Sequence, residues 1–237
     1  MNGSALGLLG FGFVLGLRHA LDVDHLAAVS TIVTQRRSLW SSSLIGAVWG
    51  LGHTAALLAV AVVVVGLHAE IPLRVSAALE LGVAAMLVVL GANVLRTVRA
   101  GGRLHLHGHE HGGRAHLHLH VHAAAGEPGA HHHTVRAGRR PFVVGLVHGL
   151  AGSAALMLAV VATIPSRPLA LAYVGVFGAG SVGGMMVMSA LLGVPLALAA
   201  DRFARAERVV RVCAGVASVT VGVVLGWEVG TAAILGA

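Results

Sequence analysis

The chain alternates between long apolar stretches and short polar breaks. A spanning helix needs about 20 mostly apolar residues, and six stretches meet this length: residues 5–33, 41–67, 74–98, 142–164, 169–199 and 209–235. The first is longer than a hydrocarbon core of about 30 Å requires, so it must tilt, protrude or break. The pattern predicts an all-α polytopic membrane protein with six transmembrane helices. Its parts are a first three-helix unit, a polar loop and a second three-helix unit, at residues 1–99, 100–140 and 141–237.

Composition supports this prediction. Apolar residues make up 57% of the chain, charged residues 11%, and the mean hydropathy is +0.87, which excludes an ordinary soluble domain. The net charge of +7 comes from arginines that gather after the first, third and fifth stretches, whereas the opposite loops hold only Arg74 and Arg167. In a membrane protein such a bias sets orientation rather than binding nucleic acid. We expect the cytoplasmic (inner) membrane, both termini outside and the polar loop in the cytoplasm.

Two segments of the first half recur in the second. Residues 13–19 (FVLGLRH) align with residues 142–148 (FVVGLVH), and residues 49–53 (WGLGH) align with residues 177–181 (FGAGS). Each unit then has three spans, and an odd number forces the second unit to be inverted in the membrane. We therefore expect two inverted three-helix repeats with a site near the midplane, as in many transporters. Chance similarity between helices rich in Gly, Leu and Val is the alternative.

A polar cluster interrupts the first apolar stretch. It contains Arg18, His19, Asp22, Asp24 and His25. Ionisable groups at bilayer depth cost about 2.5–3.5 kcal/mol each, so they usually mark an ion or substrate path. On a continuous helix His19, Asp22 and His25 share one face, and Asp24 joins them only if the helix unwinds. Imidazole and carboxylate without thiolate suit nickel, cobalt or zinc, and Arg18 is placed to neutralise Asp22 in an empty site. An Arg–Asp pair with packed histidines is the structural alternative.

Two further histidines in apolar stretches are candidate ligands. His53 lies in the second stretch and His148 in the fourth, each beside glycines that allow close helix approach. A lone histidine in a helical bundle is as often an interhelical hydrogen-bonding group. The single cysteine, Cys213, excludes a thiolate site.

The polar loop is rich in histidine. Alternating histidines bind divalent metals in many backbone arrangements, so little fixed structure is needed. The tract predicts metal capture, buffering or sensing, and a solvated linker of biased composition is the alternative. The candidate residues are His105, His107, His109, His111, His116, His118, His120, His122, His131, His132 and His133.

The two motifs of the first half resemble a known family. Residues 18–26 (RHALDVDHL) resemble the R-H-A-x-D-A-D-H-I signature of the nickel/cobalt transporter family, and residues 50–54 (GLGHT) resemble its L-G-H-[ST] motif. The D-T-A-T-E motif of its best-known members is absent, and residues 145–155 (GLVHGLAGSAA) are similar to the six-span, urease-associated nickel permease branch. The resemblance implies transport of Ni²⁺ or Co²⁺ with His19, Asp22, Asp24 and His25 at the metal path.

The leading hypothesis is a secondary transporter for a divalent transition metal, taking up Ni²⁺ or Co²⁺ under the membrane potential. The expected partners are the ion itself, the bilayer and a cytoplasmic metallochaperone, without a prosthetic group. An exporter and a non-transporting membrane sensor or accessory protein are the alternatives. The chain has no Walker phosphate loop and no H-E-x-x-H zinc-protease pattern, so we expect neither built-in ATP hydrolysis nor an enzyme.

Overall fold

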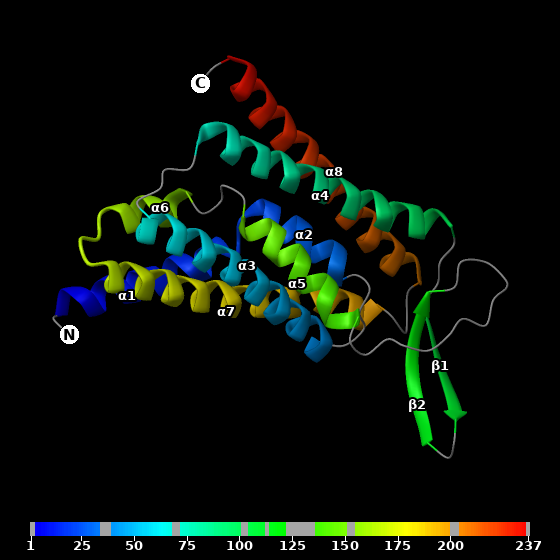
Figure 1. Ribbon diagram of the computed structural model, residues 1–237. Helices are drawn as coiled ribbons and strands as arrows, with labels where there is room; N and C mark the ends of the chain where they lie inside the picture. The colour runs from blue at the N-terminus through cyan, green and yellow to red at the C-terminus, as the bar shows by residue number, and fades with distance from the viewer. Residues whose placement is uncertain are drawn as a thin grey trace.

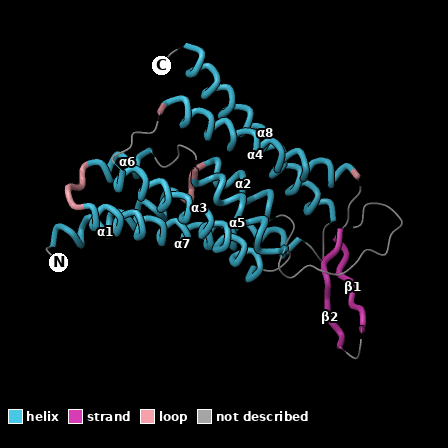
Figure 2. The backbone as a smooth tube through the Cα atoms, in the orientation of Figure 1, coloured by secondary structure: helices cyan, strands magenta, loops and turns pink. Residues whose placement is uncertain are grey.

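The computed structural model describes residues 3–33, 39–67, 72–100, 104–111, 114–121, 136–150, 155–199 and 204–235. The described apolar parts are helical, and a two-stranded hairpin, which separates the two groups of helices in the sequence, lies at one end of them (Figures 1 and 2). The elements are α1 (Gly3–His19), α2 (Val23–Val33), α3 (Leu39–Leu67), α4 (Leu73–Arg99), β1 (Leu104–His111), β2 (Arg114–Val121), α5 (Arg136–Gly149), α6 (Ala155–Ala162), α7 (Arg167–Ala199) and α8 (Ala204–Leu235).

Four helices of the described chain, α3, α4, α7 and α8, are each long and apolar enough to cross a membrane. The pair α1 and α2 adds a fifth candidate span, bent by 57° at the break between them. Of the three outcomes left open for the first apolar stretch, the structure shows a break, and it falls inside the polar cluster. The fourth expected stretch, 142–164, divides into α5 and the short α6. Large apolar side chains such as Leu73, Val89 and Val223 are 57–78% exposed, as expected for helix faces that contact lipid.

The most extensive helix contacts join the first half of the chain to the second. Helix α1 packs along α7, α3 packs against both α5 and α7, and α4 packs against α8. Figure 1 shows α4 and α8 as a pair beside the group formed by α1, α3, α5 and α7, with α2 between them. The core of that group buries the large side chains of Trp49, Leu57 and Tyr173 completely.

Glycines bring these helices into backbone contact in a reciprocal pattern. A methyl group added to Gly16 in α1 would overlap the carbonyl of Phe177 in α7, and one added to Gly145 in α5 would overlap the carbonyl of Trp49 in α3. Two further contacts repeat this pattern. Gly52 in α3 lies against the Phe142 carbonyl in α5, and the aligned Gly180 in α7 lies against the Phe13 carbonyl in α1. In each of these contacts, a glycine of one half meets a carbonyl of the other half, and the aligned residues make the same contact with the halves exchanged. Only glycine permits these approaches, because any Cβ would displace a backbone carbonyl.

The histidine-rich segment contains regular structure that our sequence analysis did not anticipate. Strands β1 and β2 pair antiparallel, from Leu104 opposite Val121 to His111 opposite Arg114. We expected only a polar loop here, for which little fixed structure is needed, and residues 104–111 and 114–121 form strands within it. The physical reason is the strict alternation of histidine with mostly apolar residues, which is the period of a strand, on both sides of a Gly-Gly pair typical of hairpin turns. His122, His131, His132 and His133 lie outside the described residues.

Candidate metal site

The break between α1 and α2 positions the first polar cluster. Helix α1 ends at His19, and the chain turns through backbone hydrogen bonds from the Leu21 amide to the Arg18 carbonyl (2.9 Å) and from the Asp22 amide to the His19 carbonyl (3.1 Å). Helix α2 begins at Val23. On a straight helix Asp24 would have faced away from the histidines. The bend brings it back among them, which meets the condition set in the sequence analysis.

His19 and His53 form the first contact of the site. His19 Nδ1 lies 2.8 Å from Asp22 Oδ2, and His19 Nε2 lies 3.1 Å from His53 Nε2. The Asp22 carboxylate accepts a hydrogen bond from His19 Nδ1, and the other ring nitrogen, Nε2, faces His53. In many metal sites, a carboxylate bonded to one ring nitrogen in this way fixes the tautomer and orientation of a histidine that binds the metal through its other nitrogen. Arg18 and Asp22 are both exposed, and the described contact of Asp22 is with His19.

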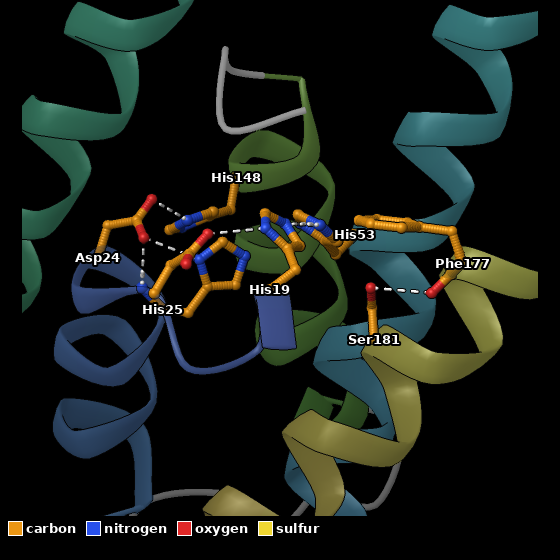
Figure 3. A network of polar contacts seen from close by, with 8 residues as sticks. His19, Asp24, His25, His53, His148, Phe177 and Ser181 are labelled. Carbon is orange, nitrogen blue, oxygen red and sulfur yellow. Dashed lines mark hydrogen bonds and ion pairs between the residues drawn. The ribbon is translucent and has the colours of Figure 1, made fainter. Parts of the chain in front are cut away.

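Asp24 joins two further imidazoles. Its Oδ1 accepts hydrogen bonds from His25 Nδ1 (2.8 Å) and from the His25 backbone amide (2.9 Å), and its Oδ2 lies 2.9 Å from His148 Nε2. Figure 3 shows the carboxylate at one side of these two rings, joined to each by a dashed line, with His19 and His53 farther from it. One carboxylate from α2 thus holds histidines from both halves of the chain, and only 20% of its side chain is exposed.

The described residues contain two groups of potential ligand atoms, each within 4.8 Å of one another. One is His19, His25 and His53, and the other is Asp24, His25 and His148, so His25 belongs to both. Three buried nitrogens in these groups have no hydrogen-bond partner: His25 Nε2, His53 Nδ1 and His148 Nδ1. A buried polar atom without a partner costs about 1–3 kcal/mol. Three such nitrogens in one cluster favour a site that binds a metal ion.

The spacing of the first pair suits a shared ion. Imidazole nitrogens bind zinc at about 2.0–2.1 Å. Two nitrogens 3.1 Å apart at that distance from one ion would subtend about 100°, between the octahedral and the tetrahedral angle. The donors are imidazoles and a carboxylate, a set that fits nickel, cobalt or zinc better than calcium or magnesium.

Aromatic side chains close the site. The Trp49 ring lies 5.4 Å from that of His25 and 5.5 Å from that of His148, and the Phe177 ring lies 5.4 Å from that of His19. Both aromatic residues are buried. Sequence reasoning aligned them as repeat positions but did not predict them as walls of the site. The signal was available, because each lies four residues before His53 or its aligned residue, Ser181, which is one helical turn.

Six predicted ligands therefore converge from four helical segments: His19, Asp22, Asp24, His25, His53 and His148. A helical membrane-type bundle with a buried histidine and carboxylate cluster is typical of a protein that handles metal ions within the bilayer. Among curated proteins, the chain is 35% identical over 206 residues to the urease accessory protein UreH of Bacillus sp. (strain TB-90), covering 83% of this chain and 81% of that protein. The chain belongs to this UreH family, on the urease-associated branch of the nickel/cobalt transporter family.

The other comparisons add no further relative. No protein-family model matches the chain, and no solved structure matches it. Its relationship to UreH places it among accessory and permease-type proteins rather than enzymes, as predicted.

Proposed function

We propose that this chain is a secondary transporter that carries Ni²⁺ or Co²⁺ across the cytoplasmic membrane into the cell. The observation that carries the proposal is the pair of ligand groups sharing His25 in the buried interior of the helices. The similarity to a urease accessory protein supports nickel as the cargo, because the resemblance described above is to the urease-associated nickel permease branch. The ion is cargo, so no prosthetic group is needed.

The shared histidine supports a two-position path. His19 and His53 form one ligand group with His25, and Asp24 and His148 form the other with it. An ion held by His19, His25 and His53 moves to the second group by exchanging its two outer ligands while His25 remains in contact. Such exchange keeps at least one protein ligand on the ion throughout, which limits the cost of a partly stripped cation in a low-dielectric interior.

The reciprocal glycine contacts support six spans in two inverted repeats. The aligned residues Gly16 and Gly145 contact the aligned residues Phe177 and Trp49. The break after α1 follows His19, and α5 ends one residue after the aligned His148. In this proposal α5 and α6 together form the fourth span, the counterpart of the broken α1 and α2.

The arginine bias supports an orientation with the termini outside and the histidine-rich segment in the cytoplasm. That segment is then placed to capture entering metal before it passes to a cytoplasmic metallochaperone. The membrane potential supplies the energy, since a divalent cation moving inward through about 100 mV gains about 4.6 kcal/mol. This corresponds to a concentration ratio of about 10³.

The test is time-resolved Ni²⁺ entry into proteoliposomes under an inside-negative potential, comparing the parent with His25→Ala and Ser181→Ala. Ser181 is the matched control: it is buried at the position aligned with His53, and its hydroxyl donates to the Phe177 carbonyl (3.0 Å). We expect flux in the parent and in Ser181→Ala, and none in a folded His25→Ala protein. Binding without flux in the parent would favour the sensor or accessory alternative. Metal sensitivity of overexpressing cells separates uptake, which worsens toxicity, from export, which relieves it.

A further inference from the structure

The β-hairpin sets histidines directly opposite one another. In the register of β1 and β2, His105 is opposite His120, His107 is opposite His118 and His109 is opposite His116. These are three consecutive histidine pairs at alternate positions of one antiparallel ladder.

Alternation assigns these pairs to one face. Residues two apart on a strand share a face, and directly opposed residues of two paired strands share it as well. The intervening positions fall on the other face and are mostly apolar. They are Leu104, Leu106, Gly108, Glu110, Ala115, Leu117, Leu119 and Val121. The segment is therefore an amphipathic hairpin with a histidine face and an apolar face, and not only a tract rich in histidine.

We propose that the three opposed histidine pairs form discrete binding sites for divalent transition-metal ions such as Ni²⁺. Directly opposed positions place their Cβ atoms about 4.5–5.5 Å apart, a separation from which two imidazoles reach one ion at about 2.0–2.1 Å. Successive pairs on the same face are about 7 Å apart along the strands, so each pair has room for its own ion. The array ends where His111 is opposite Arg114, because a guanidinium cannot act as a ligand and repels a cation.

Metal then acts on the fold of the hairpin itself. An isolated two-stranded hairpin is marginally stable in water. An ion bound between opposed strands cross-links them, so binding and strand pairing stabilise each other. The segment would gain order as metal accumulates on its side of the membrane. This inference rests on the proposed function for the identity of the metal and its side, but the binding itself is tested without transport.

The register makes a sharp experiment possible. The first variant exchanges neighbouring residues on β1 only: Leu104→His, His105→Leu, Leu106→His and His107→Leu. Composition and histidine count are unchanged, but two of the three opposed pairs are lost. The second variant adds the matching exchange on β2: His118→Leu, Leu119→His, His120→Val and Val121→His. It restores both pairs on the opposite face, since Leu104 is opposite Val121 and Leu106 is opposite Leu119.

All three proteins are purified as full-length chains carrying His25→Ala, which removes the residue shared by both intramembrane groups. Ni²⁺ binding is measured at pH 7.5 by equilibrium dialysis with metal analysis. We expect the protein with the unaltered hairpin to bind up to three ions there, the first variant to lose two of them or bind them at least tenfold more weakly, and the second to recover them. Equal binding by all three would overturn the proposal in favour of an unordered chelating tract, as would loss in the first variant without recovery in the second. Neither result depends on whether the protein transports metal.

Discussion

Replacing Asp24 with Asn tests whether the carboxylate holds the site together. The side chain keeps its shape but loses its charge and gains an amide NH₂. Its remaining carbonyl oxygen still accepts from the His25 ring and amide, and its NH₂ then faces His148 Nε2, which lay 2.9 Å from a carboxylate oxygen. The His148 bond is lost unless that ring changes tautomer, and the His25 bond becomes neutral.

The magnitude follows from these contacts. A hydrogen bond to a charged group contributes about 1.5–3 kcal/mol and a neutral one about 0.5–1.5 kcal/mol. The variant loses the charged hydrogen bond to His148 and converts the charged hydrogen bond to His25 into a neutral one. Together these changes cost about 3–4 kcal/mol, which corresponds to a loss of about 10²–10³ in metal affinity. These contacts hold the imidazoles in the orientation that a bound ion needs, so their loss appears in binding.

Asp22→Asn is the matched control because it makes the same chemical change at a weaker contact. Asp22 touches one imidazole, at 2.8 Å, and 47% of its side chain is exposed, so water replaces much of what is lost. We expect a loss of only about five- to tenfold. The assay is the initial rate of Ni²⁺ entry into proteoliposomes over a range of concentrations, compared as kcat/KM. If the two variants lose the same factor, or if Asp24→Asn matches the parent, the assignment of Asp24 as the residue that holds both histidines is wrong.

Three other predictions follow from the same structure. Gly145→Ala should destabilise the protein by about 1–3 kcal/mol, because the added methyl group meets the Trp49 carbonyl. Gly10→Ala is the control: Gly10 has no neighbour within 4 Å, so this change should be neutral or stabilising. Thermal unfolding in detergent measures both variants, and equal effects would contradict the packing. Deleting residues 104–133 should change the apparent affinity of uptake more than its maximal rate, and abolished flux by protein still in the membrane would contradict this. Acidification from about pH 7.5 to 5.5 should weaken Ni²⁺ binding to the histidine-rich segment, since imidazole titrates near pH 6.5 and must be neutral to bind; dialysis at both pH values checks it.

Much of the candidate site was predictable because its candidate ligands are ionisable residues, which are costly to bury in an apolar background. His53 and His148 stand out in apolar stretches for this reason, and they lie beside the cluster that begins at His19. The break in the first helix was predictable as well, since a stretch too long for the bilayer and polar at its middle has one favourable place to bend. The pairing of each carboxylate with a particular imidazole was not predictable, because it depends on the angle of the bend and on packing between helices far apart in sequence.

The hairpin shows a different limit. The alternation of histidine with apolar residues, which is typical of a strand, was visible in the sequence, but the segment was interpreted from its histidine content alone. Arg18 illustrates a third case. Proximity in sequence made it the natural partner of Asp22, yet the turn after α1 gives that carboxylate to His19. Local spacing on an ideal helix fails at the point where the helix ends.

The crossed packing of the two halves has a consequence for how the protein is made. As the chain emerges from the ribosome, Asp24 lacks one of its two histidines until α5 has been synthesised, and the glycine face of α1 lacks its α7 partner until later still. The first half alone therefore presents an open, incomplete set of ligands. Under the proposed transport function, nascent and truncated chains should therefore conduct metal poorly, and a complete path should form only in the full-length protein.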